Sequence, residues 1–288
     1  MNSHIRDNIV FVLVATAAFL SEPAIVAAQE NPYNPVNFTE PLNLSRGRIS
    51  PVSPDSVYLD QKDRCDLLIN EWGWSSCEGI DAMIFGLSPG IDNVMVEAPV
   101  SEGWVAFDDW DDANRKDEIE AIWNDFAAGA REQGKALGQK IEPVRWYVYP
   151  TLNKEKSYLY YAILIDWEGE LVINAKASLF DRQGYVPISV TPESTDLPEA
   201  ELQELVEISL EAYRPEAKQA YFDFQDGDKV AAVGAMGVLA TLVGVKYGKA
   251  AAAGIFAIAM VFLKKAWFLL LVPLVFLKRL IFGKKEAE

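Results

Sequence analysis

The stretch YLYYAILIDWEGELVINAKASLFDRQGYVPISVT, residues 158–191, contains three apolar segments that are separated by two short polar turns. Segments 158–166, 171–180 and 185–191 are rich in β-branched and aromatic residues, which favour β-strands. Glu168-Gly169 and Arg182-Gln183-Gly184 lie between these segments and are typical of hairpin turns. Strands that are joined by such short turns run antiparallel, so this stretch predicts an antiparallel sheet.

Further elements surround this stretch on both sides. Two more strands are predicted at residues 94–98 and 144–149. Residues 103–107 are expected to form a strand that pairs with the one at 94–98. The apolar side chains of Ile119, Ile122 and Phe126 recur at helical spacing, which predicts a helix of about 20 residues beginning after Asp112. A second amphipathic helix is predicted to begin near Pro198. The expected fold class is α+β, an antiparallel sheet with these two helices packed on one face.

The C-terminal part differs sharply in composition. Apolar runs at 230–245, 250–263 and 266–277 are separated or ended by basic residues. No run reaches the roughly 20 residues of an uninterrupted membrane span, but lysines at helix ends can extend toward the interface. We therefore predict membrane-anchor helices, a hairpin, over 229–283 and a charged tail at 284–288. The basic residues either mark the membrane interface or contact the acidic body of the protein; they are Lys246, Lys249, Lys264, Lys265, Lys278 and Arg279.

The N-terminal part has the features of an export signal. Residues 9–20 carry no charge and are too few for a membrane span, and small residues precede Gln29. We predict a signal peptide over 1–28, with an uncleaved anchor or a buried helix as the alternative. Residues 29–60 contain several prolines and are predicted to form an extended lead-in.

The charges are distributed unevenly along the chain. Residues 29–228 carry 16 basic and 38 acidic side chains, a net charge of −22, whereas residues 229–288 have a net charge of +7. Such a negative body repels phosphates, which excludes nucleic acid as its partner. We predict that residues 61–228 form an acidic extracytoplasmic domain, which would suit a cationic partner.

Few residues point to catalysis. The one histidine, His4, lies in the predicted signal, so a processed chain would lack Ser-His-Asp and Cys-His catalysis and imidazole metal sites. No cofactor is expected. Cys65 and Cys77 are expected to form a disulfide if the chain is exported, and would be free thiols in the cytosol.

The densest acidic cluster contains Asp108, Asp109 and Asp111, with Asp112 beside them. Paired carboxylates can hydrolyse glycosidic bonds, so Asp108, Asp109 and Asp111 are a candidate catalytic site. The alternative is a solvated turn whose last aspartate caps the following helix.

Several short motifs resemble a known bacterial family. The most specific is Tyr221-Phe222-Asp223-Phe224 followed by Asp228-Lys229-Val230-Ala231-Ala232-Val233-Gly234. Gly103-Trp104-Val105, Trp146 with Pro150, residues 159–162, Asn174, and Arg182 with Gly184 also fit. The pattern is similar to uncharacterised membrane-anchored proteins with domain of unknown function twenty-one sixty-seven, over roughly residue 71 to the end. A usual histidine is missing, so the chain resembles a divergent member. The resemblance implies membrane anchoring and no established activity.

Together these features predict a protein of the cell membrane whose soluble domain is extracytoplasmic, periplasmic where an outer membrane exists. We expect an envelope interaction or structural module rather than an enzyme, with the lipid bilayer and another envelope protein as partners. Two alternatives stay open. One is a carboxylate-dependent hydrolase of envelope polymers, and the other is an accessory subunit of a membrane transport complex.

Overall fold

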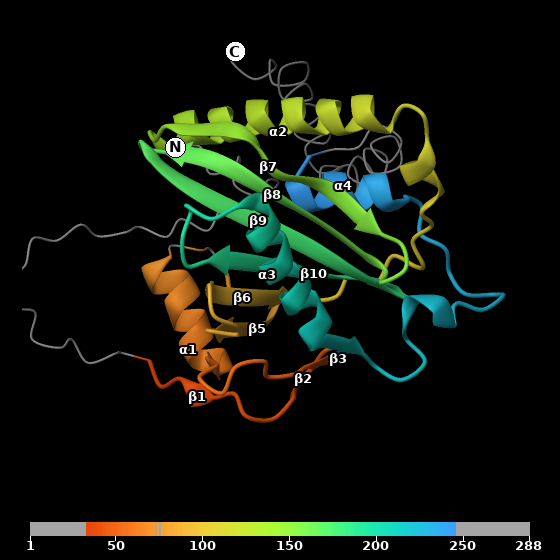
Figure 1. Ribbon diagram of the computed structural model, residues 1–288, viewed down its shortest axis with the longest axis horizontal. Coiled ribbons are helices and arrows are strands. Elements are labelled where there is room, and N and C mark those ends of the chain that lie inside the picture. Colours follow the sequence, from red (N-terminus) through yellow and green to blue (C-terminus); the bar gives the residue numbers. More distant parts are fainter. Residues whose placement is uncertain (1–32, 73, 75, 246–288) are drawn as a thin grey trace, which may run out of the picture. The chain divides into compact units, whose positions relative to one another are not determined.

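The computed structural model describes residues 33–72, 74 and 76–245, and Figure 1 shows their arrangement. The main sheet has eight strands in the order β1-β4-β5-β6-β10-β9-β8-β7, and each neighbouring pair is antiparallel. This confirms the predicted α+β class with a mostly antiparallel sheet. The strands are β1 (Val36–Asn37), β4 (Val57–Tyr58), β5 (Ile80–Phe85), β6 (Ile91–Glu97), β7 (Ile141–Asn153), β8 (Tyr158–Trp167), β9 (Glu170–Asp181) and β10 (Gly184–Pro192).

The three strands predicted from residues 158–191 are β8, β9 and β10, joined by the expected turns. In the first hairpin Asp166 lies opposite Leu171. The connecting residues Glu168 and Gly169 have φ values of 56° and 93°. A two-residue hairpin turn of type I′ needs a positive φ at both positions, which explains the glycine.

The predicted pairing of residues 103–107 with the strand at 94–98 is wrong. Strand β6 already has β5 on one side and β10 on the other, so neither of its edges is free. Residues 103–107 instead run beside the chain that leads to the last helix, where Trp104 forms a parallel bridge with Val230.

Both amphipathic helices form near the predicted positions. Helix α3 follows Pro198 as expected. Helix α2 begins at Arg115 after Asn114, so Asp112 is not its cap. The helical elements are α1 (Gln61–Asp66), the π-helix η1 (Leu67–Glu71), the 3-10 helix η2 (Asp108–Asp111), α2 (Arg115–Leu137), α3 (Glu199–Ala212), the 3-10 helix η3 (Tyr221–Asp223) and α4 (Ala235–Val243).

The two amphipathic helices cover opposite faces of the sheet, which corrects the expectation of one shared face. Ala175 of β9 belongs to the core cluster that includes Leu205 of α3. Its neighbour Lys176 lines a cavity with Phe126 of α2 and Thr241 of α4. Because adjacent residues of a strand point to opposite faces, α3 lies on one face and α2 with α4 on the other. Figure 1 shows α3 and α2 at separate sides of the strands.

The proline-rich segment is part of the fold rather than a lead-in to it. Strands β1 and β4 extend the main sheet, and Phe38 and Ile49 are buried. A second, antiparallel sheet in the order β11-β3-β2 combines this segment with the end of α3. Its strands are β2 (Leu42–Leu44), β3 (Gly47–Ile49) and β11 (Tyr213–Pro215).

The structure also places residues 229–245 with the domain, although the anchor was predicted to begin at residue 229. Helix α4 is nine residues long, and Met236, Leu239 and Ala240 are fully buried. Within residues 33–245, as far as the structure describes them, no helix is long and apolar enough to cross a membrane. The predicted signal at 1–28, the rest of the predicted anchor, the charged tail and all six predicted interface basic residues lie outside the described residues.

Candidate functional site

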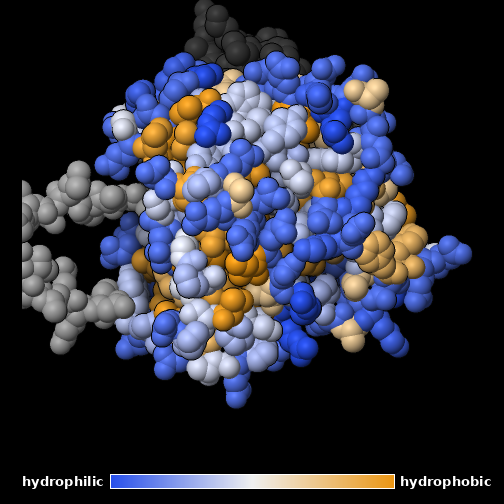
Figure 2. Space-filling model, viewed as in Figure 1, coloured by the Kyte–Doolittle hydropathy of each residue, from blue (hydrophilic) through white to orange (hydrophobic). Residues whose placement is uncertain are grey.

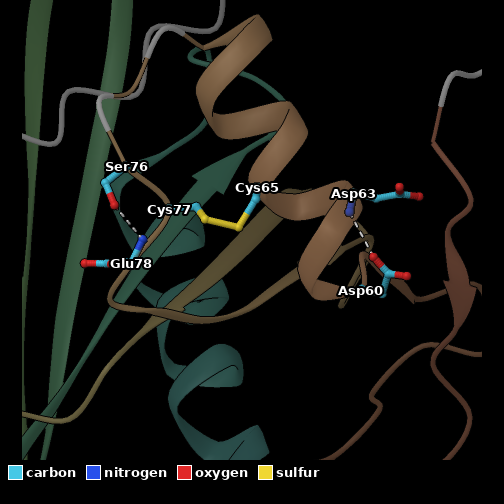
Figure 3. Close-up of a disulfide and its surroundings, with 6 residues drawn as sticks. All are labelled: Asp60, Asp63, Cys65, Ser76, Cys77 and Glu78. Atoms are coloured by element: carbon cyan, nitrogen blue, oxygen red, sulfur yellow. Dashed lines mark hydrogen bonds between the residues drawn. A yellow bond between two sulfur atoms is a disulfide. The ribbon is translucent and has the colours of Figure 1, made fainter.

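The predicted disulfide is confirmed. Cys65 on α1 is bonded to Cys77 in the segment that leads to β5, with the two Cα atoms 5.1 Å apart (Figure 3). Asp60 begins α1, because its Oδ1 accepts a hydrogen bond from the Asp63 backbone N–H at 2.9 Å. Leu68, just after α1, packs with Met83 and Met95 of the sheet. The bond therefore fixes a helical segment on one face of β5 and β6.

The candidate aspartates lie on one short turn but have different surroundings. All three belong to η2. Asp108 is exposed, and Asp111 pairs with Lys154 at 2.5 Å. Asp109 is half-buried and lies against α4. The three carboxylates therefore share one turn but have different partners.

Asp109 caps helix α4. Its Oδ2 accepts a hydrogen bond from the Met236 backbone N–H at 3.1 Å. A Cβ on Gly234 would lie 2.4 Å from this carboxylate, so the glycine gives the carboxylate room. Burial raises the pKa of Asp109, although the hydrogen bonds from the backbone of Met236 and Ala235 act in the opposite direction. Asp109 thus caps a helix, but the capped helix is α4 and not α2.

No group of three or more metal-ligating side chains occurs in the part of the chain that the structure describes. A buried ion pair lies elsewhere, between the guanidinium of Arg46 and the carboxylate of Asp181 at 2.7 Å. Arg46 also donates hydrogen bonds to the Ser101 Oγ and to the Tyr185 carbonyl oxygen. This pair connects the N-terminal segment to the turn between β9 and β10.

The motif at 221–234 is a structural junction. The Trp104 ring packs on the rings of Tyr221 and Phe224, with centroid distances of 5.0 and 4.5 Å. Its indole N–H donates to the Tyr221 carbonyl oxygen at 3.2 Å, and the Tyr221 hydroxyl donates to the Val105 carbonyl oxygen at 2.8 Å. The segments at 103–105 and 221–224, which are far apart in sequence, therefore form one contact.

Two further contacts complete the junction. The guanidinium of Arg182 forms two hydrogen bonds with the carboxylate of Asp228, at 2.6 and 2.7 Å, and this holds the pKa of Asp228 below its usual range. Gly103 has a φ of +112°, and a Cβ there would lie 2.7 Å from the Lys229 carbonyl oxygen. The residues that carry the family resemblance thus hold the chain in place directly before α4.

Acidic side chains gather on the outer side of α3. Residues 187–213 contain seven acidic and no basic residues. We call Glu199, Glu201, Glu204, Glu207 and Glu211 the α3 acidic face. Lys156 is the basic neighbour, with its Nζ 2.5 Å from Glu211 Oε1 and 3.7 Å from Glu207 Oε2. In Figure 2 hydrophilic residues cover most of the visible surface, with smaller hydrophobic areas between them.

A cavity of about 230 Å³ lies on the other face of the sheet. It is bounded by β6, β8, β9, β10 and the helices α2 and α4. The ion pair between Lys176 and Glu97 is part of its wall, as is Tyr161. These residues were not recognised from the sequence as a site, although Lys176 is a charged residue in the interior of strand β9.

The chain belongs to the family described as Protein of unknown function (DUF2167), whose model matches residues 41–275. This confirms the resemblance and extends it toward the N-terminus. No curated protein matches the chain significantly.

Among solved structures, cyanobacterial PsbP (CyanoP) from Synechocystis sp. PCC 6803 is similar at 8% identity and a TM-score of 0.27. The match covers 49% of this chain and 77% of that one. Since this TM-score falls far short of a shared fold, nothing about the present chain follows from it.

Proposed function

We propose that this chain is an envelope protein, held in the cell membrane by its C-terminal apolar segments, whose folded domain recruits a cationic partner outside the cytoplasm. The disulfide between Cys65 and Cys77 supports an oxidising compartment, because such bonds are rare in the cytosol. The apolar runs and basic residues beyond position 245 support the anchor.

The α3 acidic face carries the proposal. Glu199, Glu201 and Glu204 are exposed. No salt bridge within the described part of the chain involves these three residues. Like charges placed close together on one surface attract a partner of opposite charge and set its orientation. Since the helix buries its other side in the core, this face is free to make contacts without unfolding the domain.

Cross-linking in intact cells tests the interaction. A variant with Glu199→Gln, Glu201→Gln and Glu204→Gln removes three negative charges from the α3 acidic face. We expect the yield of the cross-linked complex to fall at least tenfold, and expect the wild-type complex to dissociate as salt increases, since screening weakens exposed charges. The matched control carries Asp117→Asn, Glu120→Gln and Asp125→Asn on the exposed side of α2. Equal loss in both variants, or no complex at all, would contradict the proposal.

Protease accessibility tests the location separately. With a C-terminally tagged copy in spheroplasts, we expect external protease to cleave the domain without detergent. Protection of the domain until detergent is added would contradict the export of this chain. Release of the intact chain by alkaline carbonate would contradict the membrane anchor.

A further inference from the structure

The cavity between the sheet and helices α2 and α4 contains polar groups with unused bonding capacity. The Lys176 ammonium lies 3.0 Å from Glu97 Oε1, and the Ser189 hydroxyl is 3.4 Å from the same oxygen. An ammonium has three donors and a carboxylate about four acceptor positions, so both ions keep free positions. Glu97 Oε2 accepts no hydrogen bond from any residue that the structure describes.

Tyr161 adds a third such group. Tyr161 is 2% exposed and lines the same cavity. Burial, and secondarily the charge of Glu97, raises the pKa of Tyr161 far above its usual value. The hydroxyl therefore stays protonated and can donate. Because Tyr161 lines the cavity, its hydroxyl can serve as a donor to a molecule that occupies this space.

The charges define the ligand. Lys176 and Glu97 are the charged residues of the cavity wall, and they cancel each other. A simple anion or cation would leave one of these two partly buried charges uncompensated, which is costly. A molecule that carries both charges preserves the balance and can use both ions at once.

We infer that this cavity binds a small zwitterion that carries an ammonium and a carboxylate on a short carbon chain, as an amino acid does. The ligand ammonium would lie at Glu97 Oε2, and its carboxylate would accept hydrogen bonds from the Lys176 ammonium and the Tyr161 hydroxyl. Phe126, Ile163 and Leu242 supply an apolar wall for an aliphatic side chain. The volume of about 230 Å³ suits a molecule of this size. This site lies on the sheet face opposite α3 and does not depend on the proposed partner.

Calorimetric titration of the full chain in detergent micelles tests the inference. The probes are glycine, DL-alanine and DL-leucine, together with 3-methylbutylamine and 4-methylpentanoate, which each lack one of the two charged groups of leucine. We expect saturable binding of at least one amino acid, and at least tenfold weaker binding of both single-charge analogues. The absence of saturable binding by every amino acid, or equal binding of either analogue, would overturn the inference.

Variants identify the site. Tyr161→Phe removes one hydroxyl from the cavity and should weaken binding at least tenfold, since a hydrogen bond to a charged group is lost. The control is Tyr160→Phe, because Tyr160 is on the same strand but faces α3, where its hydroxyl lies 3.3 Å from Glu207 Oε1. A double variant, Lys176→Met with Glu97→Gln, removes both charges together and should abolish binding while the protein stays folded. Unchanged binding in Tyr161→Phe or in the double variant would place the ligand elsewhere and overturn the assignment.

Discussion

The Asp109 carboxylate accepts a hydrogen bond from the Met236 backbone N–H at 3.1 Å, across 127 positions of sequence. Met236 is in the first turn of α4, where the backbone N–H groups have no partner within the helix. A short turn in the middle of the chain therefore caps a helix near the end of the domain. This distant contact accounts for Asp109, whereas the other aspartates of the run are exposed.

Replacing Asp109 tests this cap. Asp109→Ala should lower the free energy of unfolding by about 1 kcal/mol, because the Met236 N–H loses its acceptor. Asp109→Asn keeps an acceptor oxygen and should cost less. Chemical denaturation of both variants measures the difference. The control is Asp108→Ala, an exposed neighbour on the same turn, which should change stability little.

The raised pKa of Asp109 gives the pH dependence a definite sign. The folded protein binds this proton more tightly than the unfolded chain does. The contribution of Asp109 to stability is therefore fully present below its unfolded pKa of about 3.9 and falls as pH rises through the folded pKa. Asp109→Asn removes this dependence, so its stability relative to the wild type should increase as pH rises through that window. A constant difference between the two proteins would contradict the shift.

Arg46 and Asp181 form a pair whose separation should be costly. Both side chains are almost fully buried. Arg46→Met leaves the Asp181 carboxylate without its cationic partner and should destabilise the protein by about 3–5 kcal/mol at neutral pH. The matched control is Arg131→Met, whose partner Glu142 is exposed, and it should cost less than about 1 kcal/mol. Urea denaturation measures the free energy of unfolding of both variants. A similar decrease in both would show that burial of the Arg46–Asp181 pair has no energetic effect.

Substitution of two glycines with positive φ distinguishes the effect of backbone strain from that of a steric collision. Gly103→Ala and Gly169→Ala both place a side chain in a conformation that costs about 1–2 kcal/mol. At Gly169 the added Cβ meets nothing within 4 Å, whereas at Gly103 it would lie 2.7 Å from the Lys229 carbonyl oxygen. We expect a clearly larger fall in melting temperature for Gly103→Ala. An equal decrease in melting temperature for both variants would mean that the backbone at Gly103 and Lys229 can move apart without an energetic cost.

The disulfide should contribute substantially to stability. Closing a loop of this length in the unfolded chain corresponds to about 3 kcal/mol. The variant with Cys65→Ser and Cys77→Ser should lose close to this amount, and reduction of the wild type should give the same loss. The control is to add the reductant to the double variant, which has no disulfide, so its melting temperature should stay unchanged.

Local patterns predicted the contiguous part of the fold well. Strands β8 to β10 alternate with short turns, and α2 and α3 repeat apolar residues at helical spacing, so each is defined by neighbours in sequence. The two cysteines were paired correctly because no other cysteine exists. The position of α3 on the opposite face from α2 could not be predicted, since it depends on which side of the sheet each connection crosses.

Features that rest on distant contacts were missed. Proline-rich residues 33–60 join both sheets through partners such as β5 and β11, and their own composition indicates only irregular structure. Helix α4 has the apolar composition of a membrane segment, but the short turn at Asp109 and the sheet bury it within the domain. Glu97 and Lys176 lie on β6 and β9, and only the insertion of β10 between these strands brings the two charges together.

The position of β6 beside β10 also has a consequence for the incomplete chain. Strands β5 and β6 are synthesised first, and the second neighbour of β6, strand β10, follows only after β7, β8 and β9. Until then β6 is an open edge with unpaired backbone groups, which invites pairing with other chains. A ribosome-bound or exported intermediate that ends before residue 184 should therefore aggregate readily and depend on a chaperone. Completion of β10 should remove that dependence in a single step.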